Sequence, residues 1–514
     1  MRQSHLILSN AAIMWATRLL LLVPQLFLVP YLLGTIGESG YGVYAMVWSL
    51  MISIEQLQMS LQQGVVKYSA AFLAQKRIGE VNKVVSSSFV FSILLSVVVC
   101  AGLLVVAANY DDPSGQTGST LVAVGIMVLL IIPLTPYVAV IQSRQRYYVG
   151  ALAETVSKYI SLFVVVVWFH AVGPSVEALI IIMTGLLFLS RLAQVPVAYR
   201  LVPGLHNCLS LCNWKYFRLI VSFGGVVVLI GLCLMVNSTG VRWMMGILAS
   251  TSFVAHLSIM LMPVSLLSQL IMALTVTVMP ATSAYAATGN KHILKELLIG
   301  GMRYTMILAL AGLLSAALLM RNVLSVWVGP DYVFLAPYAL ALFASISFML
   351  STSTAHHMLK GLGWLRITVF ISVMGLVIVP IGLILAVFHI CHNPYVAVTA
   401  GLVAGNVVYG CLQIVFGSKA VHADLRVVFM RVYAQPLVVA AVIAFLAFGM
   451  VTYGGIDGLL GQTCLSAFTI LLFFGACYCV IATAAERQQL KEFFQMALDW
   501  VAVTRGIRAR VKQP

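Results

Sequence analysis

The sequence predicts an all-α polytopic membrane protein of about fourteen transmembrane helices, and three observations support this fold. Of the 514 residues, 62% are hydrophobic, and the mean hydropathy is +1.05. Only 8% are charged, whereas charged residues approach about a quarter of an ordinary soluble domain. The apolar residues also form long runs of about 20, the length that crosses about 30 Å of hydrocarbon.

Fourteen such runs follow one another along the chain. We expect spans at 9–33, 41–63, 87–108, 119–141, 150–171, 175–198, 217–238, 251–279, 300–320, 335–358, 366–388, 395–416, 434–453 and 464–484. The first run is longer than the apolar core of a secretory signal peptide, and no small-residue cleavage site follows it. We therefore expect it to remain as the first span.

The basic residues predict the orientation of these spans. Most of the 29 Lys and Arg residues fall in alternate loops, and the opposite loops hold only Arg242 and Arg321. Because Lys and Arg accumulate in cytoplasmic loops, this bias predicts cytoplasmic N- and C-termini and an even number of spans. The net charge of +15 follows from the same bias. It does not indicate nucleic-acid binding, because no basic soluble domain is present to hold a duplex.

Several enzyme classes are excluded by what the sequence lacks. It contains no Walker A glycine loop and no zinc-binding helix motif, and the predicted loops are too short for an extramembrane catalytic domain. Cys208 and Cys212 have no partners at metal-site spacing, and the nine cysteines imply no disulfide framework. We expect a protein that is not an enzyme and that binds no cofactor and no metal.

Two internal similarities suggest a duplicated six-span unit. The linkers that follow the runs 41–63 and 251–279 lie about 214 residues apart, and the turns at 142–150 and 360–366 lie about 218 apart. Matching offsets at matching topological positions are typical of transporters built from two parallel repeats. We predict an N-terminal six-helix bundle at 1–198, a C-terminal six-helix bundle at 199–416 and two additional helices at 417–484.

Residues 485–514 form the last predicted segment. Apolar side chains recur at helical spacing from Leu490 to Val501, and basic residues follow from Arg505 to Lys512. This pattern favours a cytoplasmic amphipathic helix on the anionic inner leaflet. A helix that binds a partner protein is the alternative.

Arg18 is the most unusual residue of the first span. It lies about 13 Å from the start of the span at 1.5 Å per residue, and charges at such depth usually face a cavity or a partner. It is either an anion ligand in a central cavity or one half of a structural ion pair with Glu55. Gln25 is a second polar residue of the same span, and we predict that it lines the same substrate cavity.

The second span carries a polar face. Glu55, Gln58 and Gln62 follow Trp48 on one side of a helix. Such a face lines water or packs on another helix, and we favour the water-lined cavity. Lys67 would stand at the cytoplasmic mouth of that cavity or would act as a simple membrane anchor.

Other polar residues in the spans have two interpretations each. Glu154 and Lys158 are four residues apart, which favours a helix ion pair, and Arg191 lies near the inner end of its span, where it can reach the interface. Three histidines could relay protons in coupled transport or could simply form hydrogen bonds between helices: His256, His356 and His357.

Short motifs at the span ends resemble one transporter family. They are Asn10 with Trp15, Pro30–Gly34, Tyr41–Tyr44, Gly64–Lys67, Pro280–Ser283 and Val326–Asp331. Together with the span count, they resemble lipid-linked oligosaccharide flippases of the Wzx (O-antigen and exopolysaccharide) type. This family belongs to the multidrug/oligosaccharidyl-lipid/polysaccharide transporter superfamily.

The resemblance implies a fold, an activity and a location. The fold would be two six-helix bundles facing each other, related by a pseudo-two-fold axis, with two trailing C-terminal helices. The activity would be the movement of undecaprenyl-diphosphate-linked oligosaccharide from the inner to the outer leaflet of a bacterial inner (plasma) membrane by alternating access, for surface polysaccharide synthesis. A polysaccharide polymerase and a chain-length regulator would be partners.

The resemblance also implies which residues meet the substrate. Family members place cationic residues in the cavity, the first span included, and Arg18 is the counterpart here. The C-terminal bundle has no deeply placed Lys or Arg by our span boundaries, which departs from relatives with several cavity cations. Arg303 would compensate if it faces inward.

Two other function classes compete with the flippase. A cation-coupled drug antiporter of the same superfamily should have twelve spans and deep carboxylates, and Glu55 is the one plausible deep acid in the sequence. A membrane glycan polymerase or ligase needs a sizeable external loop with reactive groups, and the predicted loops are short.

Overall fold

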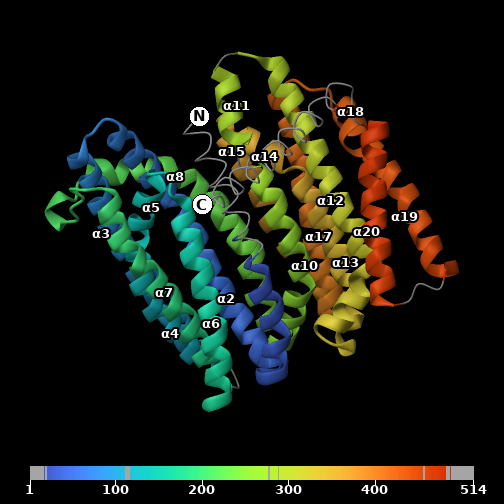
Figure 1. The fold of residues 1–514 in the computed structure, drawn as a ribbon, viewed down its shortest axis with the longest axis horizontal. Coiled ribbons are helices and arrows are strands. Elements are labelled where there is room, and N and C mark those ends of the chain that lie inside the picture. Colours follow the sequence, from blue (N-terminus) through green and yellow to red (C-terminus); the bar gives the residue numbers. More distant parts are fainter. Residues whose placement is uncertain are drawn as a thin grey trace, which may run out of the picture. The chain divides into compact units, whose positions relative to one another are not determined.

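The computed structural model describes residues 17, 20–109, 116–275, 278–287, 289–454, 458–481 and 487. Every regular element in these residues is helical (Figure 1). Twelve helical segments among them are long and apolar enough to cross a membrane. The predicted fold class, an all-α polytopic membrane protein, is therefore confirmed.

The second predicted span and residues 22–33 of the first fall within α2 (Leu22–Ala74). The helix runs through Pro30 and leaves helical geometry at Gly37, which has φ 72° and ψ 178°. Residues with a Cβ rarely adopt this conformation, so a glycine is needed there. Gly37 thus separates the two spans within the predicted connection 34–40.

The remaining elements continue the predicted order. Unbroken helices are α3 (Ile78–Asn109), α6 (Tyr147–Ala171), α7 (Val176–Leu201), α12 (Lys291–Trp327) and α17 (Pro394–Ala420). Interrupted segments are α4 (Gln116–Ile131), η1 (Ile132–Leu134) and α5 (Thr135–Ser143); α8 (Trp214–Met235), η3 (Val236–Gly240) and α9 (Val241–Leu248); α10 (Thr251–Thr275) and α11 (Val278–Ala287). Further segments are η4 (Pro330–Leu335), α13 (Ala336–Ser351) and α14 (Ser353–Gly361); α15 (Leu365–Val373), η5 (Met374–Ile378) and α16 (Val379–Cys391); α18 (Leu425–Val428), η6 (Phe429–Ala434) and α19 (Gln435–Gly454); α20 (Leu459–Ala476) and η7 (Cys477–Ile481).

The chain forms two compact units. Unit 1 combines 1–266, 324–345 and 363–412, and unit 2 combines 267–323, 346–362 and 413–514. In unit 1, α3 packs on α4, α4 packs on α7, and α6 packs on α7 (Figure 1). These units group residues by proximity and cut across several helices. The division into bundles at 1–198, 199–416 and 417–484 stays a prediction.

Left-handed turn residues recur at a fixed interval along the chain. Four pairs of residues with positive φ are separated by about 213 to 219 positions, close to the spacing of the predicted repeat. In each pair one member is a glycine, the residue that tolerates this conformation best. The pairs are Lys76 with Gly289, Gln145 with Gly363, Gly173 with His392, and Gly204 with His422. A duplicated six-helix unit would produce this regularity.

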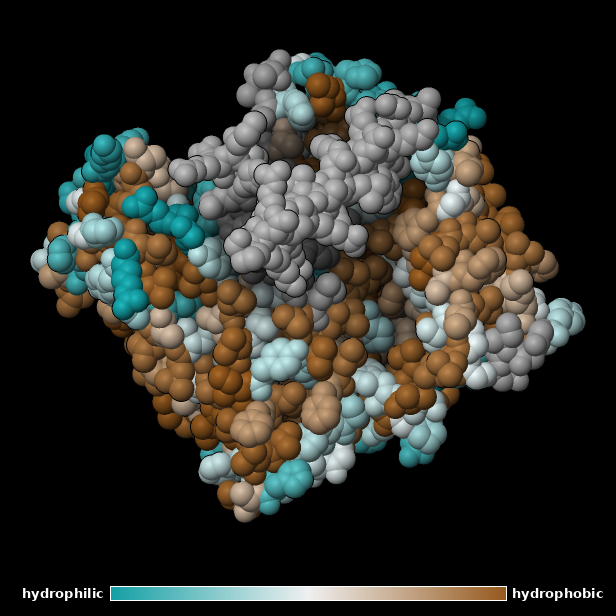
Figure 2. Space-filling view, viewed as in Figure 1, coloured by the Kyte–Doolittle hydropathy of each residue, from teal (hydrophilic) through white to brown (hydrophobic). Residues whose placement is uncertain are grey.

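The helix surfaces are those of a membrane protein. Large apolar side chains are highly exposed, for example Phe445 at 79% and Phe163 at 70%. Figure 2 shows hydrophobic residues over the middle of the helices and hydrophilic residues gathered toward their ends. Lipid tails would cover such a surface, because apolar side chains gain nothing from contact with water.

The segment 202–213, which joins α7 to α8, is fastened to α3. Asn82 donates from Nδ2 to the Gly204 carbonyl oxygen at 3.0 Å and accepts from the His206 backbone N–H at 3.1 Å. Farther along α3, Ser86 and Ser87 accept hydrogen bonds from the backbone N–H groups of Cys208 and Asn213. The segment is therefore held along a helix and is not a free tether.

Glycines bring α17 close to η5 and α16. A Cβ on Gly405 would stand 2.6 Å from the carbonyl oxygen of Gly375, and one on Gly401 would stand 2.7 Å from that of Pro380. Both distances are too short for a real Cβ. Gly401 and Gly405 are four residues apart, the spacing of small residues at tight helix crossings in membranes.

Candidate functional site

Four charged side chains meet among the membrane helices of unit 1. Arg191 of α7 reaches Glu55 of α2, with 3.5 Å between Nη2 and Oε1. Lys158 of α6 lies 3.0 Å from Glu154 one turn earlier in the same helix. Glu154 and Lys158 are also electrostatic neighbours of Glu55. The four groups form one network of two cations and two carboxylates.

The network is only partly buried. The exposed fractions of the four side chains run from 26% for Arg191 to 36% for Glu55 and Glu154. Charges at membrane depth seldom face lipid and normally face a water-filled cavity or one another. This network satisfies its charges internally and keeps part of each group accessible.

The structure adds a partner to Arg191. This residue was predicted to reach the interface, and it pairs with Glu55 because α2 and α7 pack together. The predicted Glu154–Lys158 pair is present. Arg18 lies outside the described residues, so its expected choice between the cavity and Glu55 stays open, although Glu55 has a cationic partner in Arg191.

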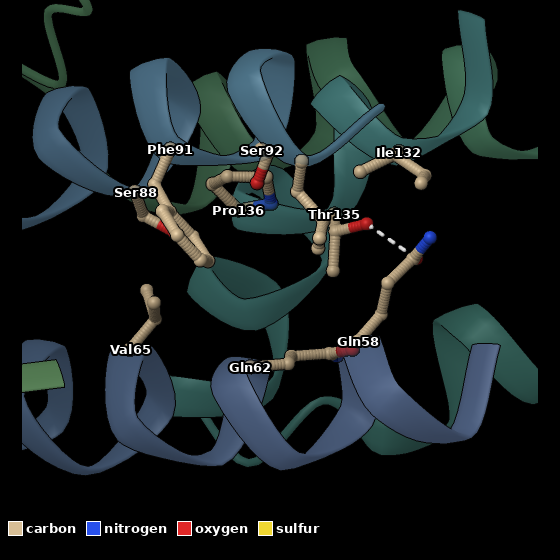
Figure 3. Close-up of a pocket in the computed structure, with 10 residues that line it drawn as sticks. Gln58, Gln62, Val65, Ser88, Phe91, Ser92, Ile132, Thr135 and Pro136 are labelled. Carbon is tan, nitrogen blue, oxygen red and sulfur yellow. Dashed lines mark hydrogen bonds between the residues drawn. The ribbon is translucent and has the colours of Figure 1, made fainter. Parts of the chain in front are cut away.

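Gln58 and Gln62 of α2 lie against α5. The Thr135 hydroxyl donates to Gln58 Oε1 at 3.0 Å, and Gln62 Nε2 donates to Gln142 Oε1 at 3.0 Å. Figure 3 shows Gln58 and Gln62 on one side of a small cavity, opposite Thr135 and side chains of α3. Both glutamines are buried, and the cavity of about 10 Å³ is no larger than a water requires. In this conformation Gln58 and Gln62 connect α2 to α5. Their contact with substrate stays a prediction.

Three other predicted site residues have distinct surroundings. Gln25 is partly exposed on α2. Lys67 is exposed and places its Nζ 5.4 Å from the centre of the Tyr68 ring. Arg303, on α12 in unit 2, is 7% exposed, stacks 5.7 Å from the Tyr304 ring and has Arg431 as an electrostatic neighbour. Their roles in substrate binding stay predictions.

The paired histidines of α14 belong to unit 2. The Nδ1 atom of His356 lies 3.2 Å from Nε2 of Gln413 on α17, and the rings of His356 and His357 are 5.5 Å apart. The hydrogen bond to Gln413 matches the interpretation of His356 as a helix-interface residue, and a coupling role stays a prediction.

His256 has the most elaborate surroundings of the predicted residues. Its Nδ1 atom lies 2.7 Å from the Tyr395 hydroxyl, and its Nε2 atom lies 3.4 Å from Glu38 Oε1. All three residues are in unit 1. The sequence indicated His256 but gave no sign of its partners, because they come from helices distant in the chain.

Within the described residues, no group of three or more His, Cys, Asp and Glu side chains could hold a metal ion. The predicted amphipathic segment 485–514 lies almost wholly outside the described residues, with Arg487 as its one described member. Its membrane role stays a prediction.

Comparisons with known proteins place the fold. No protein-family model and no curated protein sequence matches the chain. Among solved structures, the lipid II flippase MurJ in an inward closed conformation matches 92% of this chain and 99% of its own, with a TM-score of 0.68 and 12% identity.

Other transporter structures are similar over less of the chain. An inward-facing multidrug resistance MATE family transporter of the MOP superfamily matches 80% of this chain and 98% of its own, with a TM-score of 0.65 and 13% identity. A MOP superfamily transporter from Pyrococcus furiosus matches 81% and 94%, with a TM-score of 0.59 and 13% identity. The chain therefore has the fold of MOP superfamily transporters.

Proposed function

We propose that this protein flips an undecaprenyl-diphosphate-linked oligosaccharide from the cytoplasmic to the outer leaflet of a bacterial inner membrane by alternating access. The glycan would serve surface polysaccharide synthesis, with a polymerase and a chain-length regulator acting after export. The proposal builds on a fold shared with transporters and on the sequence resemblance to oligosaccharide flippases.

One observation carries the choice of a lipid-linked substrate. The lipid II flippase structure matches 92% of this chain, whereas the first drug-transporter structure matches 80%. The additional matched length favours the architecture of a lipid flippase over that of a drug exporter.

The charges inside the membrane suit a diphosphate. Arg18 is the predicted cavity cation, and Lys158 and Arg191 could reach a diphosphate only by exchanging their present carboxylate partners Glu154 and Glu55 for it. A diphosphate oxygen offers these groups the same kind of charge-assisted hydrogen bond as a carboxylate. The polar network would serve the head group while the polyprenyl tail stays in the bilayer.

The drug antiporter is the second candidate function. It needs deep carboxylates that bind a coupling ion or a cationic drug. Glu55, the plausible deep acid of the sequence, is neutralised by Arg191 at 3.5 Å. This pairing makes Glu55 a poor cation site, and it weighs against the antiporter.

Reconstituted vesicles test the proposal. Purified protein should accelerate the transfer of a labelled undecaprenyl-diphosphate oligosaccharide between leaflets. Arg18→Ala should abolish the transfer, and Arg18→Lys should retain a part of it, because an ammonium keeps the charge but loses the bidentate guanidinium. Arg144→Ala is the control, since Arg144 is exposed in the turn between α5 and α6.

Two results would overturn the proposal. One is normal transfer by Arg18→Ala protein that is correctly inserted. The other is ion-driven transport of a cationic dye by the reference protein with no transfer of the lipid-linked glycan, which would establish the antiporter.

A further inference from the structure

Glu38, His256 and Tyr395 form a continuous chain of polar contacts in unit 1. Glu38 follows Gly37 at the predicted external turn of α2, and its carboxylate lies 3.4 Å from Nε2 of His256 on α10. On the opposite edge of the imidazole, Nδ1 lies 2.7 Å from the hydroxyl of Tyr395 on α17. The Tyr332 hydroxyl of η4 also hydrogen-bonds to Glu38. One imidazole and one carboxylate thus connect four segments that are far apart in sequence.

Aromatic rings surround this polar chain. The His256 ring lies 5.8 Å from Tyr332 and 5.6 Å from Phe334, both at steep angles, and 5.9 Å from Tyr395 in a stacked arrangement. Phe253 and Phe334 also pack edge-on against Tyr395, at 4.9 and 5.6 Å. Rings at these separations stabilise one another, so the contact is a packed junction.

His256 is buried, yet it lines a cavity. It is 9% exposed, and its Nε2 atom is fully covered. A cavity of about 370 Å³ opens against His256 and Tyr395, and Ser250, Ser252 and His392 contribute to its lining. Protons can therefore reach the junction from the predicted external side.

A second contact reinforces the junction a few residues away. The hydroxyls of Ser39 and Thr251 are 2.9 Å apart. At Gly42, an added Cβ would overlap the carbonyl oxygen of Thr251. The backbones of α2 and α10 therefore approach as closely as glycine permits.

We propose that His256 is a proton-binding site, and that proton uptake there locks the predicted external ends of α2, α10, η4 and α17 together. The inference rests on the alternating-access function proposed above and adds the coupling ion, a proton, and the place where it acts. Release of the proton would loosen the junction and permit opening on that side.

The charge of the imidazole is the physical basis of the lock. A neutral imidazole has one N–H donor, whereas a protonated one has two. The cation donates from Nε2 to the Glu38 carboxylate and from Nδ1 to the Tyr395 hydroxyl, and a charged pair is roughly twice as strong as a neutral hydrogen bond. Histidine changes charge within the physiological pH range.

Among the described residues, few charged groups other than Glu38 lie near His256. The titratable groups that face it or its direct partners are Glu38, Tyr332, Tyr395, Tyr338, His392 and Asp331. Glu38 is the carboxylate in direct contact, and Asp331 adds negative charge beside Tyr332. A positive charge on the imidazole would be attracted to both carboxylates, so proton uptake would strengthen the junction.

Spin-label distances in reconstituted full-length protein test this inference. Labels are placed at Gly34→Cys, an exposed position where an added Cβ meets no neighbour within 4 Å, and at Ala249→Cys, in a chain whose nine native cysteines are replaced. Distances are recorded at about pH 5 and pH 8.5 without any substrate. We expect one short distance at low pH and at least a threefold increase in a longer-distance population at high pH. His256→Gln should abolish this pH dependence, and Glu38→Gln should weaken it.

The control is His170→Gln, because His170 is an exposed histidine at the predicted external end of α6. It should leave the pH response unchanged. A response that persists in both His256→Gln and Glu38→Gln, or a reference protein without any pH response, would overturn the inference. The spin-label measurement uses no glycan, so it tests the proton-dependent contact separately from the proposed flippase activity. Either hypothesis can be refuted while the other holds.

Discussion

Glu55 and Arg191 each carry a charge that the membrane interior would penalise, and each compensates the other. Their pairing also draws α2 against α7 through two long side chains. Removing one partner leaves an uncompensated charge, whereas removing both leaves a neutral polar contact. This asymmetry makes the pair suitable for a double-mutant cycle.

The first prediction concerns this pair. Glu55→Gln and Arg191→Gln should each lower the thermal stability of the purified protein, by about 1–3 kcal/mol, between the values for exposed and buried pairs. The double variant should lose less than the sum of the two. Arg77→Gln is the control, since Arg77 makes an exposed pair with Glu80 at 3.8 Å. Additive losses in the double variant would contradict the coupling.

The sequence predicts contacts within one helix better than contacts between helices that are far apart in the chain. The Glu154–Lys158 pair was predictable because both residues lie on one turn of one helix. Arg191 and Glu55 are 136 positions apart, so their contact depends on how α2 and α7 rotate and pack. Gln58 and Gln62 share a helix face, as predicted, but the sequence did not reveal that α5 covers that face.

Glycine spacing determines the packing of α17 on η5 and α16. Gly401 and Gly405 let two backbones meet without intervening side chains, and the carbonyls of Pro380 and Gly375 fill the space. Helices in lipid gain stability from such close contact because the hydrophobic effect gives them little there.

The second prediction tests this contact at the level of the helix pair. Gly405→Ala should destabilise the protein by about 1–3 kcal/mol, the usual effect of overfilling a packed site. The measurement is the thermal midpoint in detergent. Gly382→Ala on α16 is the matched control, because an added Cβ there has no neighbour within 4 Å. Equal midpoints for the two variants would contradict the packing argument.

The sequence predicts the positions of the membrane spans better than the irregular turns within them. Long apolar runs locate most helices, because about 20 apolar residues must span the bilayer whatever their order. The 3-10 turn at Ile132–Leu134 follows from Pro133, which cannot donate a helical hydrogen bond. The π-helical turn η5 precedes Pro380, which cannot donate to the Leu376 carbonyl, whereas η3 had no such signal. They lie together in unit 1, where Asn237 donates to the Leu376 carbonyl at 3.1 Å.

The orientation of the complete molecule is the subject of the third prediction. Cys208 and Cys391 are both exposed and belong to predicted opposite sides. A hydrogen bond from Ser210, at 3.1 Å from Sγ, lowers the pKa of the Cys208 thiol. A larger thiolate fraction at neutral pH makes Cys208 the faster-reacting target.

Single-cysteine variants and a membrane-impermeant maleimide provide the measurement. The variant that keeps Cys208 should be labelled in inverted vesicles and protected in right-side-out vesicles, and the variant that keeps Cys391 should behave in the opposite way. Ser210→Ala should slow the labelling of Cys208 severalfold without changing its sidedness. Labelling of both cysteines from one side would refute the predicted topology.

The fastening of residues 202–213 to α3 has a mechanical consequence for the molecule as a whole. A loose connection would let the two predicted halves rock independently, with the pivot anywhere along its length. Asn82, Ser86 and Ser87 of α3 form hydrogen bonds with this connection up to Asn213. We therefore expect the connection and α3 to move as one rigid unit. Any rocking motion between the predicted halves then has to be accommodated after Asn213 rather than within this connection.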